Sequence, residues 1–138
     1  MIQHEAVANR NKFNTKCSIY SYRYWIYFPF FIGDLIEKGI VRRLPEDFDG
    51  NKSPYVFTWS REIPNKTWAM ASGCAPYYNT CKEGTSNTKM VRDFENDTFE
   101  IYAVTDIAKD EELLHTYISL KWRKCFSDLN DIIHADEK

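Results

Sequence analysis

The chain has 138 residues, 43% of them hydrophobic and 28% charged, so it fits one globular domain of about 100–150 residues and is too short for two full domains. Eighteen basic and 20 acidic residues give a net charge of −2, and no Lys or Arg run could form a phosphate-neutralising surface, which argues against a nucleic-acid partner. The longest apolar run, residues 25–32, contains Pro29 and falls far short of the roughly 20 residues that cross a bilayer, so no membrane partner is expected.

The four cysteines, Cys17, Cys74, Cys81 and Cys125, are scattered and form no Cys-x-x-Cys pair. This spacing argues against a zinc site built locally in the sequence and favours reduced, mostly structural thiols, so no metal is expected. The N-terminus lacks the order of basic, apolar and small residues that makes a secretory signal. We therefore expect a cytoplasmic protein, or one that reaches the host nucleus if its source is a virus. No pattern in the sequence bears on the oligomeric state.

The first segment, residues 1–16, is polar and shows no hydrophobic period, which predicts a loose N-terminal arm. Residues 17–32 are mostly Tyr, Trp, Phe and Ile. These aromatic and β-branched residues suit a pleated surface, and they predict one or two strands. Gly33-Asp34 then predicts a turn.

Short strands separated by turns continue along the chain. Residues 35–41 predict a strand, which ends before Pro45 and the turn-rich residues 47–51. Residues 55–59 form another β-rich pentad, and residues 68–71 predict a further strand. This alternation of β-rich stretches with turn residues favours a sheet of short strands.

The second half of the chain predicts a hairpin and then a helical end. Residues 89–94 and 99–104 alternate polar and apolar side chains and are expected to pair, joined at residues 95–97. Only residues 120–133 have helical spacing, enough for a turn or two before an acidic tail at residues 127–138. No internal repeat is visible, and the fold class predicted from the pattern is mostly β.

Three motifs follow one another in a fixed order. Residues 73–79 read Gly-Cys-Ala-Pro-Tyr-Tyr-Asn, residues 86–88 read Ser-Asn-Thr, and residues 107–117 read Ile-Ala-Lys-Asp-Glu-Glu-Leu-Leu-His-Thr-Tyr, with Trp122 shortly after. Together they resemble the SET domain, whose corresponding stretches read Gly-x-Gly-x-x-x-Asn-His-Ser, Pro-Asn-Ala and Ile-x-x-Gly-Glu-Glu-Leu-Thr-x-x-Tyr. Compact bacterial and viral members also place a Trp just after the Tyr.

Two upstream stretches extend the resemblance, which covers roughly Tyr22 to Trp122. Residues 33–37 read Gly-Asp-Leu-Ile-Glu and residues 55–59 read Tyr-Val-Phe-Thr-Trp, like the family's Gly-Glu-Leu-Ile-Glu and Tyr-x-Phe-x-Trp. The resemblance implies a SET-like domain at residues 17–126, with the β-clip architecture of short sheets around a threaded, pseudoknot-like C-terminal segment.

The resemblance also implies a function, S-adenosylmethionine-dependent methylation of a lysine ε-amine in a protein or peptide, with a basic tail as one candidate substrate. Methyl transfer from a sulfonium to an amine is an in-line displacement, so the enzyme chiefly aligns a neutral amine in a dry channel. Tyr117 is the implied catalytic residue. The implied cofactor-binding residues are Tyr22, Arg23, Tyr24, Asn79, Thr80 and Trp122. The candidates for the lysine channel are Tyr55, Tyr77, Tyr78 and Tyr102.

Each of these residues also has an ordinary structural explanation. A strand-end tyrosine such as Tyr117 commonly packs half-buried, Asn79 suits a turn, and Trp122 could close a small core. Glu111 and Glu112 are expected to be structural, with Glu112 satisfying backbone donors. His115 has no evident partner, which argues against a metal or acid–base role.

The sequence departs from the family pattern on the cofactor side. Tyr22-Arg23-Tyr24 stands where the family has Gly-x-Gly, a loop whose glycines allow close backbone approach to the cofactor. Thr80 replaces the family histidine, and Asp110 replaces a glycine at a turn where Asp tolerates a left-handed conformation. Two alternatives follow: a non-catalytic SET-like module that binds peptides, and an unrelated small β-rich interaction domain.

Overall fold

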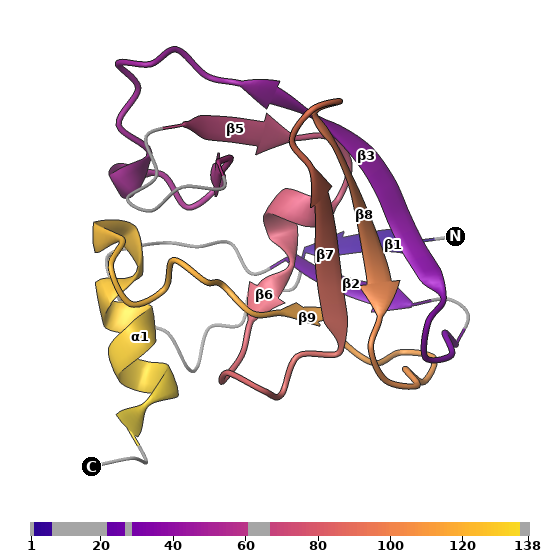
Figure 1. The fold of residues 1–138 in the computed structure, drawn as a ribbon. Helices are drawn as coiled ribbons and strands as arrows, with labels where there is room; N and C mark the ends of the chain where they lie inside the picture. The colour runs from indigo at the N-terminus through magenta and orange to yellow at the C-terminus, as the bar shows by residue number, and fades with distance from the viewer. Residues whose placement is uncertain (1, 7–21, 27–28, 61–66, 136–138) are drawn as a thin grey trace.

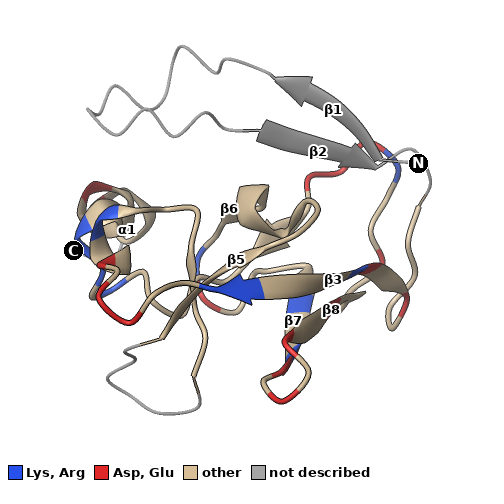
Figure 2. Cartoon of the chain, turned by 90° about the horizontal axis from the view of Figure 1, so that it is seen from above, with Lys and Arg blue, Asp and Glu red and all other residues tan. Residues whose placement is uncertain are grey.

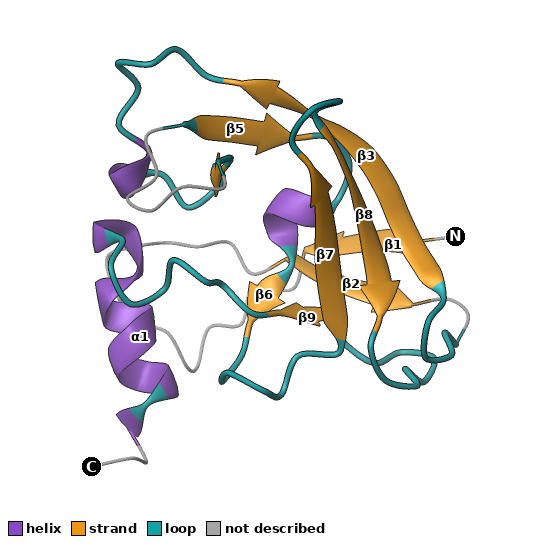
Figure 3. Cartoon of the chain, in the orientation of Figure 1, coloured by secondary structure: helices purple, strands orange, loops and turns teal. Residues whose placement is uncertain are grey.

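The computed structural model describes residues 2–6, 22–26, 29–60 and 67–135, with side chains described from residue 29 onward. Short strands dominate, with three 3-10 turns and one short helix among them (Figures 1 and 3). The elements are β1 (Ile2–Ala6), β2 (Tyr22–Ile26), β3 (Leu35–Arg43), η1 (Gly50–Lys52), β4 (Phe57–Thr58), β5 (Trp68–Ala71), η2 (Ala75–Tyr77), β6 (Asn79–Thr80), β7 (Thr88–Asp93), β8 (Thr98–Ala103), β9 (Leu114–His115), η3 (Lys124–Phe126) and α1 (Ser127–Ile133). The mostly β prediction is confirmed.

The main sheet has five antiparallel strands in the order β4-β5-β3-β8-β7. The predicted hairpin is confirmed, because β7 pairs with β8 from Thr88 opposite Ala103 to Asp93 opposite Thr98. Along β8, Phe99, Ile101 and Ala103 are buried while the residues between them are half-buried. This alternation of period two places one face of the sheet on the core.

The two edge strands of the sheet approach each other because the sheet curls (Figure 1). Arg92 of β7 donates from Nη1 to the carbonyl oxygen of Thr58 in β4 at 2.7 Å. Its guanidinium also lies 5.8 Å from the ring centroid of Trp59. One side chain therefore bridges strands at opposite edges of the sheet.

The C-terminal segment is threaded through the middle of the fold. β9 pairs in parallel with β6, Asn79 opposite Leu114 and Thr80 opposite His115. On the other side of this segment, the amide of Asn87 donates to the Glu112 carbonyl at 2.8 Å and accepts from the Leu114 amide at 2.8 Å. The chain then runs on to η3 and α1, at the left of Figure 1. This arrangement is the threaded segment that the SET resemblance implies.

The N-terminal region differs from expectation at one place. β1 lies inside residues 1–16, expected to be a loose arm, and pairs antiparallel with β2 from Ile2 opposite Ile26 to Ala6 opposite Tyr22. The partner strand lies far along the chain, so the local pattern of residues 2–6 gave no sign of the pairing. Residues 7–16 lie outside the described residues, and the division into arm, domain and tail stays a prediction.

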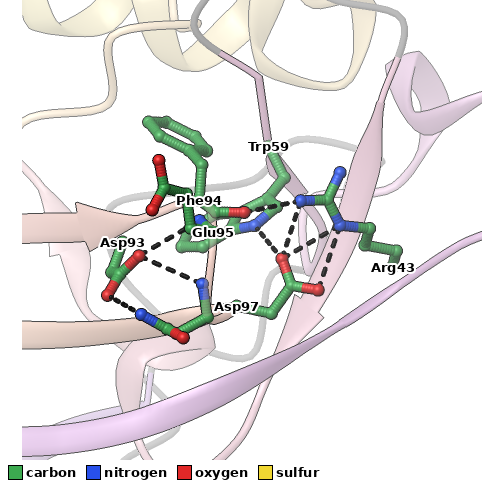
Figure 4. Close-up of polar contacts among 7 residues, drawn as sticks. Arg43, Trp59, Asp93, Phe94, Glu95 and Asp97 are labelled. Atoms are coloured by element: carbon green, nitrogen blue, oxygen red, sulfur yellow. Dashed lines mark hydrogen bonds and ion pairs between the residues drawn. The ribbon is translucent and has the colours of Figure 1, made fainter.

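The turn between β7 and β8 carries a closed polar cluster (Figure 4). Asp97, at a left-handed φ of 52°, accepts from Arg43 Nε at 2.9 Å and from the indole nitrogen of buried Trp59 at 2.9 Å. Arg43 also donates to the Phe94 carbonyl at 2.7 Å, and the tilted rings of Trp59 and Phe94 pack with centroids 5.0 Å apart. These contacts lock the hairpin end onto β3. Around the molecule, acidic residues gather mainly at such turns (Figure 2).

In the described part of the chain, the one α-helix spans seven residues, and no helix there has the length and apolar character of a membrane span.

Candidate functional site

Tyr117 lies just beyond the β6–β9 crossing. Its hydroxyl donates to the carbonyl oxygen of Tyr78, the residue that precedes β6. Its backbone amide donates to Thr80 Oγ1 at 3.2 Å, and its ring packs 5.1 Å from the ring of Phe126. Burial raises the pKa of the Tyr117 hydroxyl above its ordinary value, so the group stays protonated and can donate a hydrogen bond at neutral pH.

The side chain of Asn79 bonds an acidic side chain from the segment that leads into β9. Its amide nitrogen donates to Glu112 Oε1 at 2.5 Å. Glu112 is half-buried, and its carbonyl oxygen accepts from Asn87. The crossing therefore brings together Asn79, Thr80 and Tyr117, as the motifs imply. Glu112 bonds a side chain of the site, whereas the sequence suggested only that it satisfies backbone donors.

The neighbouring glutamate and aspartate shape the turn before this segment. Glu111 accepts from the Ala108 amide at 2.9 Å, and Asp110 adopts a left-handed φ of 66°. The expectation that Asp110 can fill a position where the family has glycine is confirmed.

Glu37, a residue that the sequence did not single out, supports the loop before Asn79. Its carboxylate accepts from the Tyr78 hydroxyl at 2.9 Å and from the Cys74 amide at 2.7 Å. Gly73 has a φ of +69°, and a Cβ there would lie 2.1 Å from Glu37 Oε1. Glycine is thus required for both backbone conformation and space. The signal was present in the Gly-Asp-Leu-Ile-Glu stretch, whose last residue lies opposite the motif.

The four channel candidates do not gather in one place. Tyr78 is only 2% exposed and points its hydroxyl at Glu37. Tyr55 and Tyr77 form a partly exposed pair with ring centroids 6.2 Å apart. Tyr102 lies on the face of β8 opposite the core and donates its hydroxyl to Glu100. The structure thus separates Tyr102 from the tyrosines near the crossing, because the period of two along β8 turns it outward.

Trp122 is 49% exposed, with its ring centroid 6.2 Å from that of buried Trp68. It therefore keeps a free face and does not close the core. Arg123, which follows it, is only 4% exposed and stacks between Trp68 and Phe126, at 4.9 and 4.8 Å from their ring centroids. Sequence reasoning missed Arg123, since nothing local marks an arginine for burial.

Arg123 fixes the C-terminal segment to the loop around η1. Its guanidinium donates to the carbonyl oxygens of Gly50 at 2.8 Å, of Val56 at 3.0 Å, and of Ser53. Nε of the same side chain is buried and has no hydrogen-bond partner among the described residues. Burial lowers the pKa of Arg123 from its ordinary value. The segment from Tyr117 to Phe126 is thereby tied to the loop that carries Tyr55.

His115 lies in β9 beside Thr88, with Nδ1 3.3 Å from the threonine hydroxyl. Burial, with a smaller contribution from Arg92, lowers its pKa to about 4. The side chain is neutral at physiological pH, which suits a packed residue better than an acid–base catalyst. Among the described residues, no three His, Cys, Asp or Glu side chains gather as a metal would require.

The remaining cofactor candidates, Tyr22, Arg23 and Tyr24, lie on β2, where the backbone pairing is described but the side chains are not. An open hollow of about 470 Å³ lies between the loop after β6 and the C-terminal helix. It is open to solvent, and its lining is polar and charged, unlike the mostly apolar lining typical of small-molecule sites. It is lined by Lys82, Glu83, Lys121, Asn130 and His134.

Comparison with solved structures shows the same fold in methyltransferases. A candidate histone methyltransferase from Plasmodium falciparum is 16% identical with a TM-score of 0.58, over 84% of this chain and 91% of that one. A chain of the Chaetomium thermophilum Polycomb Repressive Complex 2 bound to S-adenosylmethionine is 16% identical with a TM-score of 0.57, over 88% of this chain and 16% of that one. The SET domain of the RIZ1 tumor suppressor is 14% identical with a TM-score of 0.51, over 99% of this chain and 80% of that one.

No curated protein sequence matches the chain closely enough to count as a relative. The family model of the SET domain, however, matches residues 2–118, which is most of the chain. That match includes the crossing of β6 and β9 with its Asn79, Glu112 and Tyr117. The chain belongs to the SET-domain family.

Proposed function

We propose that this protein transfers a methyl group from S-adenosylmethionine to a lysine ε-amine of a protein or peptide. The observation that carries the proposal is the Tyr117 hydroxyl, held against the Tyr78 carbonyl beside Asn79 at the threaded crossing of a SET fold. A SET family match and structural similarity to histone methyltransferases support the same activity class.

Tyr117 acts in this proposal by positioning the amine. Its hydroxyl proton is committed to the Tyr78 carbonyl, so the oxygen keeps lone pairs that can accept a hydrogen bond from the substrate amine. An amine that donates its N–H there turns its own lone pair toward the methyl donor, which aligns an in-line displacement. The raised pKa of Tyr117 keeps the phenol neutral throughout.

The residues at the crossing fit the cofactor in chemistry, because Asn79 offers a side-chain amide and Thr80 a hydroxyl beside Tyr117. The open 470 Å³ hollow lies beside the loop that follows them, and none of the residues assigned to the cofactor lines it. Asn79 and Thr80 would hold the polar end of the cofactor, the exposed face of Trp122 would contact its adenine, and the backbone of residues 22–24 would lie along it. When bound, S-adenosylmethionine supplies the electrophilic methyl group of its sulfonium.

The proposed substrate is a lysine-containing segment in extended form. β4 and β7 are the edge strands of the main sheet and come together near Tyr117 through the Arg92–Thr58 hydrogen bond. Exposed strand edges commonly accept an extended peptide by backbone pairing. The partly exposed Tyr55 and Tyr77 are the aromatic residues available to line the lysine path.

Two measurements on the full chain test the proposal: calorimetric titration with S-adenosylmethionine, and mass spectrometry of lysine peptides incubated with protein and cofactor. Cofactor binding with peptide methylation is the expected result. Binding of cofactor and peptide without transfer would favour the non-catalytic reading, in which Tyr22 and Tyr24 in place of glycines have cost the activity. No cofactor binding at concentrations on the order of 1 mM would overturn the enzyme proposal.

A further inference from the structure

A second, smaller hollow lies on the side of Tyr117 that faces β4 and β7. It has a volume of about 30 Å³, enough for roughly one water molecule or a small polar group. Tyr117, His115 and Thr116 line one wall, and Pro54 and residues 56–58 line another. The hollow is therefore a neighbour of the tyrosine that positions the amine in the proposed reaction.

Two arginines from distant parts of the sequence line this hollow, Arg92 from β7 and Arg123 from the C-terminal segment. Neither guanidinium pairs with a carboxylate among the described residues, where their acceptors are backbone carbonyls, the Ser119 hydroxyl and the Cys125 side chain. Burial lowers the pKa of both side chains, as expected for cations removed from water without a compensating anion.

The hollow is consequently cationic. None of its lining residues is Asp or Glu, and His115 is neutral at physiological pH. Arg92 uses one of its five N–H donors in the hydrogen bond to Thr58. It thus retains donors for a further acceptor, and the planar guanidinium matches a carboxylate in two parallel hydrogen bonds.

We propose that this hollow receives the carboxylate of an Asp or Glu beside the target lysine, so that the protein selects lysines with an acidic neighbour. The inference rests on the proposed function, which supplies the target lysine. It adds the class of peptide in which that lysine would lie. A Lys or Arg of the substrate would meet two like charges there, whereas a carboxylate meets two opposite ones. The positive charge of the hollow thus argues against a uniformly basic tail as the substrate.

The test compares three labelled peptides with one lysine and a Glu, Gln or Lys one or two residues away, measured by fluorescence anisotropy with the full chain. The Glu peptide is expected to bind about 5–20-fold more tightly than the Gln peptide and the Lys peptide more weakly still. Arg92→Gln should reduce the Glu advantage to about twofold or less, and Arg92→Lys should keep part of it. Far-ultraviolet circular dichroism checks that both variants are folded.

Lys89→Gln is the matched control, because it removes the same charge from the same strand on the opposite, exposed face. It should leave the Glu preference unchanged. Equal binding of the Glu and Gln peptides, an unchanged preference in folded Arg92→Gln, or no peptide binding would each overturn the inference. Methyl transfer to the bound peptides is measured separately, so preference without transfer refutes only the proposed function, and transfer without preference refutes only this inference.

Discussion

Two networks of polar side chains in this molecule are built around carboxylates that accept hydrogen bonds, but they lie in different surroundings. At the end of the β7–β8 hairpin, Asp97 accepts hydrogen bonds from both Arg43 and the indole of Trp59 (Figure 4). At the β6–β9 crossing, the Glu112 carboxylate accepts a hydrogen bond from Asn79. The Tyr117 hydroxyl donates to the Tyr78 carbonyl, and Tyr117 lines the smaller hollow.

The difference lies in what each network faces. The hairpin cluster closes one end of a sheet, and its partly exposed ion pair of Arg43 and Asp97 adjoins solvent. The crossing is assembled from segments more than 30 residues apart in sequence, Asn79 and Glu112 among them, and Tyr117 beside it lines the smaller hollow. A substitution in a network that stabilises the fold should lower the free energy of unfolding. A substitution in a network that binds a ligand should lower the affinity for that ligand.

Between the two networks, the larger effect is expected at Asn79. Asn79→Ala removes the proposed cofactor contact and leaves the half-buried Glu112 carboxylate without one of its donors, so the dissociation constant for S-adenosylmethionine should rise about 10–100-fold. Calorimetric titration measures it. Asn96→Ala is the control, since that amide also bonds a carboxylate, that of Asp93, but in the turn between β7 and β8. Equal loss of affinity in both variants would remove the distinction between the networks.

Asp97→Ala should act on stability alone. The indole nitrogen of Trp59, whose side chain is buried, loses its acceptor, which costs about 2 kcal/mol of unfolding free energy. Urea denaturation measures this loss, and cofactor affinity is expected to stay within about twofold of the parent at temperatures where the variant is folded. A weakened affinity in a fully folded variant would show that the hairpin cluster also serves the site.

The sequence predicts those elements of the fold whose signals lie in contiguous residues, and it misses those that depend on distant partners. The β7–β8 hairpin was predicted because its alternation and its turn residues are contiguous, and Gly33-Asp34 is a turn for the same reason. β1 was missed because the strand it pairs with, β2, lies some 20 residues away in sequence. The helix begins at Ser127, later than the spacing from Leu120 suggested, because Arg123 and its carbonyl partners hold the preceding segment irregular.

The site shows the same division. Asn79, Thr80 and Tyr117 were predicted as site residues because a motif of fixed spacing names them, and the structure brings them together at the β6–β9 crossing. Glu37 and Arg123 act through contacts across 37 to 73 residues of sequence, which no local pattern encodes. Tyr102 was grouped with the channel by residue type alone, and the strand period turns it to the opposite face.

The smallest effect is expected at His115 and depends on pH. Its folded-state pKa of about 4 lies below the ordinary value of about 6.5, so the unfolded chain binds the proton first as pH falls. No contribution arises above pH 6.5, and stability declines between about pH 6.5 and pH 4, by about 1–2 kcal/mol after allowance for partial exposure. Denaturation of the parent and His115→Gln at pH 7 and pH 4.5 should show a smaller decline in the variant. Parallel declines would mean that His115 titrates normally.

The central claim is that the Tyr117 hydroxyl positions the amine for methyl transfer, and one measurement addresses it directly. Single-turnover methyl transfer at saturating S-adenosylmethionine is compared for the parent, Tyr117→Phe and the control Tyr102→Phe, which loses a hydroxyl on the outer face of β8. Tyr117→Phe should slow transfer about 100–1,000-fold with cofactor affinity nearly unchanged, while Tyr102→Phe keeps the parent rate. An unaltered rate in Tyr117→Phe would contradict the mechanism.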